Sequence, residues 1–180
     1  MGFGSTVSSW SSGDGCAMRI IHKMTHQEAI IETLHRILTQ KDEIVRVFSR
    51  GNPFDKLLRS YDQFTSTGLP LYKSKRGKDH YRYSRKAAES KLEASELYGE
   101  HRVPLSIIRQ RLLECDRSVG SIKTIMESNE VVLITKEEQR LLDLKEPTGL
   151  GLRSKIPKCG TDRLEFANIE VAQESLGNKL

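Results

Sequence analysis

Residues 129–143 read NEVVLITKEEQRLLD, and this stretch carries the clearest structural signal in the chain. Its first part, VVLIT at 131–135, is a run of β-branched and aliphatic residues of the kind that forms a buried strand. Thr135 and Glu138 are then spaced as a capping box, in which each side chain accepts a hydrogen bond from the other residue's backbone. We therefore predict a strand that leads directly into a helix over 136–145.

A second strand is predicted upstream, in the stretch YGEHRVPLS at 98–106. Pro104 disfavours a helical conformation in the residue before it, so EHRV at 100–103 favours a short strand. Two helices are expected between the strands. The first follows Ser106, which we expect to act as its N-cap, and the second covers IKTIMES at 122–128.

The N-terminal side of the chain is predicted to be helical. Thr25 and Glu28 form another capping box, and apolar residues recur at helical spacing from there to Gly51. This pattern predicts one long amphipathic helix, or two with a break near residues 40–41. A further short helix is expected to begin at Asn52-Pro53. The apolar face of the N-terminal helix would supply core or a homodimer interface.

The segment between these regions is strongly basic. LYKSK at 71–75 and HYRYS at 80–84 flank a candidate tight turn, which predicts a β-hairpin, and a helix is expected over 85–97. In HYRYS the alternation places the tyrosines toward the core and the cations outward. Basic residues at this density are typical of surfaces that bind phosphates, although a solvated hairpin has the same composition. The candidate nucleic-acid-binding residues are Lys73, Lys75, Arg76, Lys78, Arg82, Arg85 and Lys86, extended by Arg102.

These elements predict an α+β fold with a helical N-terminal part, a β-hairpin and a small ββα-like core with helical insertions. We predict a disordered leader at 1–23, a helical segment at 24–66, an α+β domain at 67–172 and a flexible tail at 173–180. A last strand is expected within DRLEFANIEV at 162–171.

Composition narrows the class of protein. The chain has 180 residues, 37% of them hydrophobic and 29% charged, which indicates a globular domain with a core of its own. A net charge of +5 favours polyanionic partners such as nucleic acid. Three scattered cysteines predict no disulfide framework and favour the reducing cytoplasm. No apolar run is long enough to span a membrane, and no signal peptide is evident.

The segments EHRVPLS and NEVVLITKEEQRLLD together resemble the two halves of the ββα-metal core of the HNH, or His-Me finger, endonucleases. The resemblance covers about residues 98–145 and is partial. It implies that His101 is the general base, with Asn129 orienting it, and that Glu100, Glu130 and Gln139 are candidate ligands of a divalent metal. The third ligand stays open between Asn129 and Glu130. No histidine follows His101, so Gln139 stands where the family has its final histidine.

The chemistry of these residue types fits phosphodiester hydrolysis. Histidine is the side chain whose ordinary pKa lies near neutrality, so it can accept a proton from water. Oxygen ligands suit Mg²⁺ or Mn²⁺, which would stabilise the charge that develops on the phosphate. We therefore expect an HNH-like metal-dependent endonuclease acting on DNA, with RNA as a second possible substrate. The alternative is a non-enzymatic nucleic-acid-binding or protein-interaction module with a degenerate core.

Overall fold

A computed structural model of the chain describes residues 24–49, 52–145, 147–157 and 162–172. The predicted leader and C-terminal tail lie outside these residues. The helices of the described part are α1 (His26–Leu38), α2 (Asp42–Ser49), α3 (Asn52–Gln63), α4 (Gly77–His80), α5 (Arg85–Glu89), α6 (Leu105–Glu114), α7 (Val119–Glu127), α8 (Lys136–Asp143) and α9 (Arg163–Phe166). The strands are β1 (Arg82–Tyr83), β2 (Tyr98–His101) and β3 (Val131–Ile134). The predicted α+β class is confirmed.

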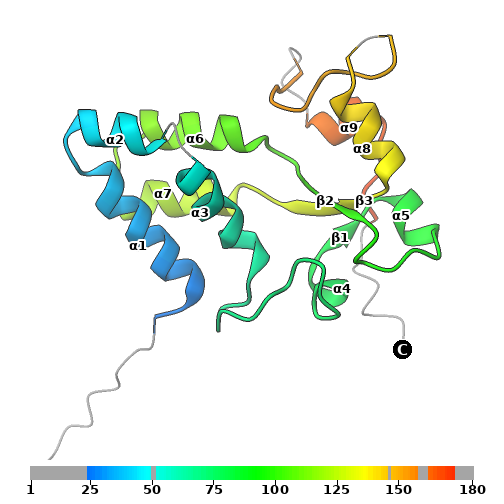
Figure 1. Ribbon diagram of the computed structural model, residues 1–180, viewed down its shortest axis with the longest axis horizontal. Coiled ribbons are helices and arrows are strands. Elements are labelled where there is room, and N and C mark those ends of the chain that lie inside the picture. The colour runs from blue at the N-terminus through cyan, green and yellow to red at the C-terminus, as the bar shows by residue number, and fades with distance from the viewer. Residues whose placement is uncertain (1–23, 50–51, 146, 158–161, 173–180) are drawn as a thin grey trace, which may run out of the picture.

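The described chain has a helical half and a half built around a small sheet (Figure 1). In the helical half, α1, α2, α3, α6 and α7 surround one apolar core that includes Leu34, Phe54 and Ile122. The N-terminal helix is broken, as one of the two predicted arrangements required, because α1 ends at Leu38 and α2 starts at Asp42. The apolar face of α1 is buried in this core, whereas Ile44, Val47 and Phe48 of α2 are exposed. The predicted homodimer stays a prediction.

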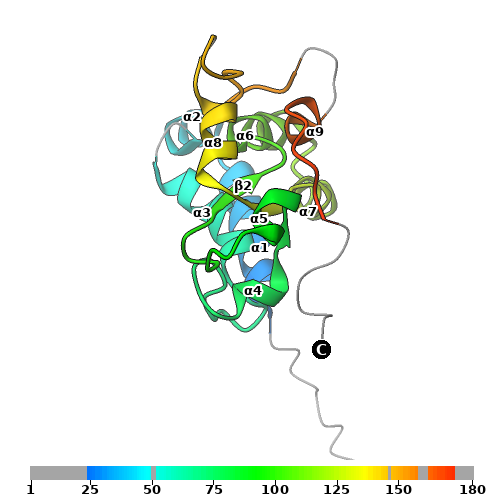
Figure 2. The same ribbon diagram turned by 90° about the vertical axis from the view of Figure 1, so that its right-hand side faces the viewer.

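The sheet has the order β1-β3-β2, so β2 is an edge strand. β2 pairs antiparallel with β3, and β1 pairs parallel with it. Because side chains alternate along β3, Val132 and Ile134 join the cluster formed with α8 and α9, while Leu133 joins the cluster on the opposite face. In both Figure 1 and Figure 2, α8 and α9 lie above the sheet and α4 lies below it.

Two of the three helix caps predicted from the sequence are formed. The capping boxes of Thr25 and Thr135 are both formed, and Ser84 caps α5. The buried Ser84 hydroxyl also donates to Glu138 over 2.7 Å, which ties the start of α5 to the start of α8. Ser106 does not cap α6, because the helix begins one residue before it and Pro104 occupies the N-cap position.

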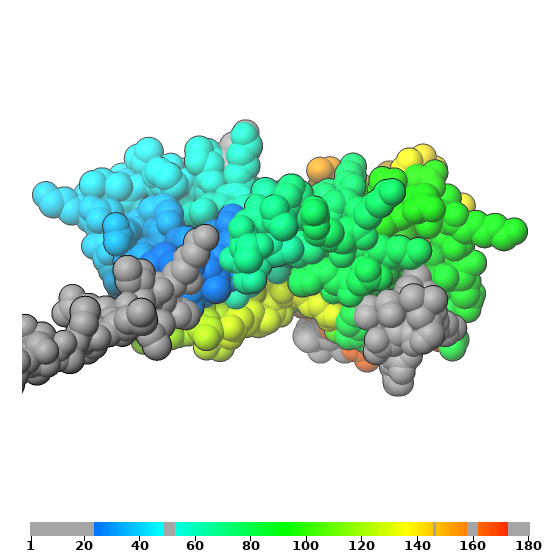
Figure 3. All heavy atoms as spheres, turned by 90° about the horizontal axis from the view of Figure 1, so that it is seen from below, coloured from blue at the N-terminus to red at the C-terminus, as the bar shows by residue number. Residues whose placement is uncertain are grey.

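The predicted β-hairpin at 71–84 is wrong. The chain instead makes successive turns after Leu71, forms the short helix α4, and pairs β1 with the distant β3. A side chain at Gly77 would meet the Leu71 carbonyl oxygen at 2.3 Å, so this compact path requires glycine. The predicted inward orientation of the tyrosines is confirmed, since Tyr81 and Tyr83 are 4% and 3% exposed. Figure 3 shows this teal segment between the blue helical half and the green residues of the sheet half.

Two further predicted elements differ. The helix expected over 85–97 ends at Glu89, because the chain must turn to bring β2 antiparallel to β3. The strand expected at 162–171 is replaced by α9 and a single bridge between Ser84 and Val171. The Asp162 side chain accepts from the Leu164 backbone and so starts a helix instead. No helix of the described residues has the length and apolar character needed to cross a membrane.

Candidate functional site

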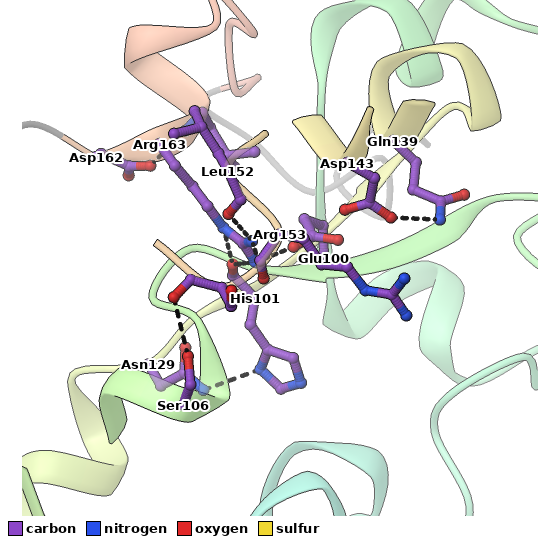
Figure 4. A network of polar contacts seen from close by, with 12 residues as sticks. Glu100, His101, Ser106, Asn129, Gln139, Asp143, Leu152, Arg153, Asp162 and Arg163 are labelled. Atoms are coloured by element: carbon purple, nitrogen blue, oxygen red, sulfur yellow. Dashed lines mark hydrogen bonds and ion pairs between the residues drawn. The ribbon is translucent and has the colours of Figure 1, made fainter. Parts of the chain in front are cut away.

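Glu100 and His101 end the edge strand β2, at the junction between the two halves of the molecule. Opposite them on β3 stand Val132 and Val131. Because neighbouring residues of a strand point to opposite faces, the two side chains enter different surroundings although both are only 7% exposed. Figure 4 shows Arg163 and the His101 ring on opposite sides of β2.

On the first face, the Glu100 carboxylate forms an ion pair with Arg163 at the start of α9. The same guanidinium donates through Nε to the His101 carbonyl over 2.9 Å and through Nη1 to the Leu152 carbonyl over 3.2 Å. Burial lowers the pKa of Arg163 to about 10, which still leaves it charged at neutral pH. Glu100 is therefore neutralised by a cation that also holds the edge of the sheet.

On the second face, His101 meets polar groups from the helical half. The Asn129 side-chain nitrogen lies 2.9 Å from His101 Nδ1, and the Asp62 carboxylate lies 3.8 Å from the same atom. Burial, together with the charge of Arg59, lowers the pKa of His101 to about 4. Burial raises the pKa of Asp62 to about 7. At neutral pH the imidazole is therefore uncharged and keeps a lone pair.

Two buried oxygens beside His101 lack a hydrogen bond within the described part of the chain, namely Asp62 Oδ2 and Asn129 Oδ1. The ring atom Nε2 has no hydrogen-bond partner there either. Buried polar groups of native proteins are nearly always hydrogen-bonded, so groups without a partner in the described chain can bind a water molecule or a ligand. The His101 face therefore differs from the Glu100 face in keeping unused hydrogen-bonding capacity.

A pocket of about 350 Å³ runs beside these residues. It is lined by Gly99, Glu100 and His101 of β2, by Asp55 and Arg59 of α3, by the start of α6 with Ser106 and Arg109, and by Arg153 and Ser154. The site thus gathers groups from both halves of the molecule around the end of the edge strand. Gly99 lies here because a side chain at this position would meet the Tyr72 ring at 2.6 Å.

The other candidate metal ligands have protein partners. Glu130 pairs with Arg82 over 3.3 Å and with Arg102 over 2.9 Å. The Gln139 amide donates to Asp143 over 3.1 Å. Among the residues that the structure describes, no three His, Cys, Asp or Glu side chains are grouped so that they could hold a metal ion. Of the residues predicted from the family pattern, the structure brings His101 and Asn129 into contact and engages Glu100, Glu130 and Gln139 elsewhere.

The predicted nucleic-acid-binding residues divide into two groups. Four pair with acidic residues, namely Arg82, Arg85, Lys86 and Arg102. The other four are exposed, and within the described ranges none of them forms an ion pair: Lys73, Lys75, Arg76 and Lys78. Only the second group, on the connection before α4 and on α4 itself, has no acidic partner within the described chain.

Sequence reasoning did not identify Asp62, Arg59, Arg153 or Arg163 as parts of this site. Asp62 belongs to a helix end 39 positions before His101, and Arg163 follows Glu100 by 63 positions. The only local signal is Asp162, whose N-cap of α9 places Arg163 in the first turn. Comparison of the chain with protein-family models, curated proteins and solved structures finds no match.

Proposed function

We propose that this protein is an HNH-like endonuclease that hydrolyses phosphodiester bonds of DNA, with His101 as its general base. The observation that carries the proposal is the buried, uncharged imidazole of His101, held by Asn129 at the entrance to the second strand of a β2-β3-α8 unit. Strand, strand and helix follow one another in the order that the family resemblance implies, with α6 and α7 inserted between the strands.

Asn129 supports this role through its amide. The oxygen and nitrogen of an amide have nearly the same shape, so the 2.9 Å contact admits two assignments. If the amide oxygen faces His101, it accepts from Nδ1–H, and the lone pair of the ring is then at Nε2. This assignment also gives Asn129 Oδ1 the hydrogen bond that it otherwise lacks. Asn129 then fixes both the tautomer and the orientation of the base.

In the proposed reaction, Nε2 of His101 takes a proton from a water molecule, whose oxygen attacks the phosphorus atom. The new bond forms as the bond between phosphorus and the leaving sugar oxygen breaks, and that oxygen takes up a proton from solvent. A base with a pKa near 4 is already deprotonated at neutral pH, although it is weaker than an ordinary histidine. Asp62, which lies 3.8 Å from Nδ1, would stabilise the imidazolium that forms when the ring accepts this proton. The basic residues of the pocket face the phosphate.

Mg²⁺ or Mn²⁺ remains a predicted cofactor of this proposal. Glu100 is engaged by Arg163 and Glu130 by Arg82 and Arg102, so these predicted ligands do not fit a metal site in their present arrangement. No step of the reaction above passes through a metal ion.

A plasmid-nicking assay of the purified protein tests the proposal, with Mg²⁺, Mn²⁺ or EDTA and with an RNA substrate in parallel. We expect nicking of DNA that His101→Ala reduces by about a hundredfold or more, the usual contribution of a general base. His80→Ala is the matched control, because His80 is an exposed histidine of α4 outside the pocket. Equal nicking by wild type and His101→Ala would disprove the proposed base.

The four exposed cations that form no ion pairs favour a second candidate, a non-enzymatic module that binds nucleic acid. On this alternative, Lys75→Glu with Lys78→Glu removes binding to a DNA duplex, while His101→Ala and EDTA change nothing. Arg85→Glu with Lys86→Glu is the control, since it changes the charge equally at residues that already pair with acids. Gel-shift titrations at low salt measure both effects. Metal-dependent nicking would decide against this candidate.

A further inference from the structure

Two arginines at the pocket stand out by their lack of partners. Arg59 comes from α3 and Arg153 from the segment after α8, and both side chains are exposed. Neither side chain forms a hydrogen bond or ion pair with another described residue. By contrast, Arg163 and Arg109 of the same pocket pair with Glu100 and Asp55. Two guanidinium groups from separate elements of the pocket wall therefore remain available to an anion.

The N-terminus of α6 opens into the same pocket. Its N-cap is Pro104, which has no side-chain acceptor, and the backbone N–H groups of Leu105 and Ser106 have no acceptor within the described chain. A helix start with unsatisfied N–H groups binds anions, because these donors and the helix dipole both favour negative charge. The Ser106 hydroxyl donates to the Ser154 carbonyl over 3.2 Å and keeps its lone pairs.

A third, independent feature points to a ligand at this place. His101 lines the pocket, is more than nine-tenths buried, and has no hydrogen-bond partner at Nε2 among the described residues. Its neutral ring does not repel a cationic or anionic group by charge. Four arginines and three acids line the pocket, so its net charge is +1. Two of the acids, Glu100 and Asp55, pair with Arg163 and Arg109, and Asp143 accepts a hydrogen bond from Gln139.

We infer that this pocket is a phosphate-binding site, in which Arg59, Arg153 and the N-terminal amides of α6 hold one phosphate group of a nucleic-acid strand beside His101. Guanidinium groups and helix-start amides are both preferred partners of phosphate oxygens. The inference deepens the proposed function, on which it rests for the identity of the strand. It also assigns phosphate recognition at the site to residues outside the basic segment 73–86.

The first test uses inorganic phosphate as the probe. We expect phosphate, titrated against the full chain at constant ionic strength, to shift the backbone amide resonances of Leu105 and Ser106. In Arg59→Gln with Arg153→Gln, the affinity for phosphate should fall at least tenfold. Arg111→Gln is the matched control, as an exposed arginine near the far end of α6 that forms no ion pair in the described chain and lies outside the pocket. Equal affinities in wild type and double variant would overturn the inference.

A second test distinguishes the source of the phosphate and separates this inference from the proposed activity. A short single strand is titrated with and without a 5′-phosphate. If the wild type binds the phosphorylated strand more tightly and the double variant loses this preference, the pocket binds a terminal phosphate. If both strands bind equally and the double variant weakens both, the pocket binds an internucleotide phosphate. His101→Ala should keep phosphate binding. A wild-type protein that binds phosphate through these arginines but does not nick DNA fails the nuclease proposal and not the pocket. A wild-type protein that nicks DNA, but whose phosphate affinity is the same in the double variant, fails the pocket alone.

Discussion

The two faces of β2 carry neighbouring buried polar residues, of which Glu100 has its charge and hydrogen bonds satisfied and His101 does not. Glu100 has a cation in direct contact, and that cation also binds the carbonyls of His101 and Leu152. His101 shares one contact with Asn129 and stands 3.8 Å from a carboxylate, while two nearby oxygens lack hydrogen bonds within the described structure.

This difference assigns Glu100 a structural role and leaves His101 as the candidate for a chemical role. A buried ion pair with its hydrogen bonds satisfied holds the chain in place, and it offers nothing further to a ligand. A buried histidine that has a displaced pKa and lines a pocket has the properties expected of a reacting group. In the sequence, Glu100 and His101 form one motif. The structure divides their roles.

The largest effect on stability is expected from removing the buried ion pair between Glu100 and Arg163. Arg163→Met leaves Glu100 as a buried carboxylate without a cation and removes the donor from three backbone carbonyls. We expect the free energy of unfolding to fall by about 3–5 kcal/mol, measured by urea denaturation. Arg153→Met, at an exposed arginine nearby, should cost less than about 0.5 kcal/mol. Adding Glu100→Leu to Arg163→Met should restore part of the loss, and no recovery would argue against an uncompensated charge as the cause.

The shifted pKa values of Asp62 and His101 should make the free energy of unfolding depend on pH. Asp62 has a pKa of about 7 in the folded chain against an ordinary 3.8, so between these values only the folded chain holds the proton, and stability falls as pH rises. His101 has a pKa of about 4 against 6.5, so between these values only the unfolded chain is protonated, and stability falls as pH falls. The two contributions oppose each other between pH 4 and 6.5.

Single variants should separate these slopes. In Asp62→Asn, the free energy of unfolding should rise between pH 4 and 6.5, by a few kcal/mol at most. In His101→Ala it should fall between pH 4 and 7, and in the wild type it should change least. Denaturation at a series of pH values measures all three. Parallel profiles in the two variants would show that neither group titrates as described.

A smaller effect is expected at the contact between Asn129 and His101. Asn129→Ala removes the hydrogen bond to Nδ1 and should lower the free energy of unfolding by about 1–3 kcal/mol, because the ring atom stays buried. If Asn129 orients the base, the nicking rate should fall as well, with the substrate affinity unchanged. Ser128→Ala, at the exposed preceding residue, is the control. Loss of stability without loss of nicking would reduce Asn129 to a structural residue.

The smallest effect is expected at an exposed ion pair. Arg85 and Glu170 lie 2.7 Å apart, but both side chains are 68% exposed. Arg85→Ala should change the free energy of unfolding by about 0–1 kcal/mol, because solvent screens the charges. Urea denaturation beside Arg163→Met compares an exposed and a buried arginine pair in one chain. If Arg85→Ala lowers the free energy of unfolding as much as Arg163→Met does, burial is not the reason why the two ion pairs differ.

Helices and strands could be predicted from the sequence where nearby residues mark their ends, as helix caps do. The capping boxes at Thr25 and Thr135 and the aliphatic strand after Glu130 depend on neighbours within a few positions, so they are confirmed. The hairpin was wrong because its two halves have better partners far along the chain: Leu71 binds back to Gln63, and β1 pairs with β3. Strand pairing is a long-range choice that alternation alone does not contain.

The sequence by itself determined the α+β class and the adjacent Glu100 and His101 on a short strand, because period and capping act through near neighbours. Only the tertiary structure decided what each of them touches. Packing of α9 against β2 gave Glu100 its arginine, and the meeting of α3 with the strand placed Asp62 beside His101. These contacts join residues tens of positions apart. They form because the apolar cores of the two halves bring distant segments together, and a local sequence pattern does not encode such long-range packing.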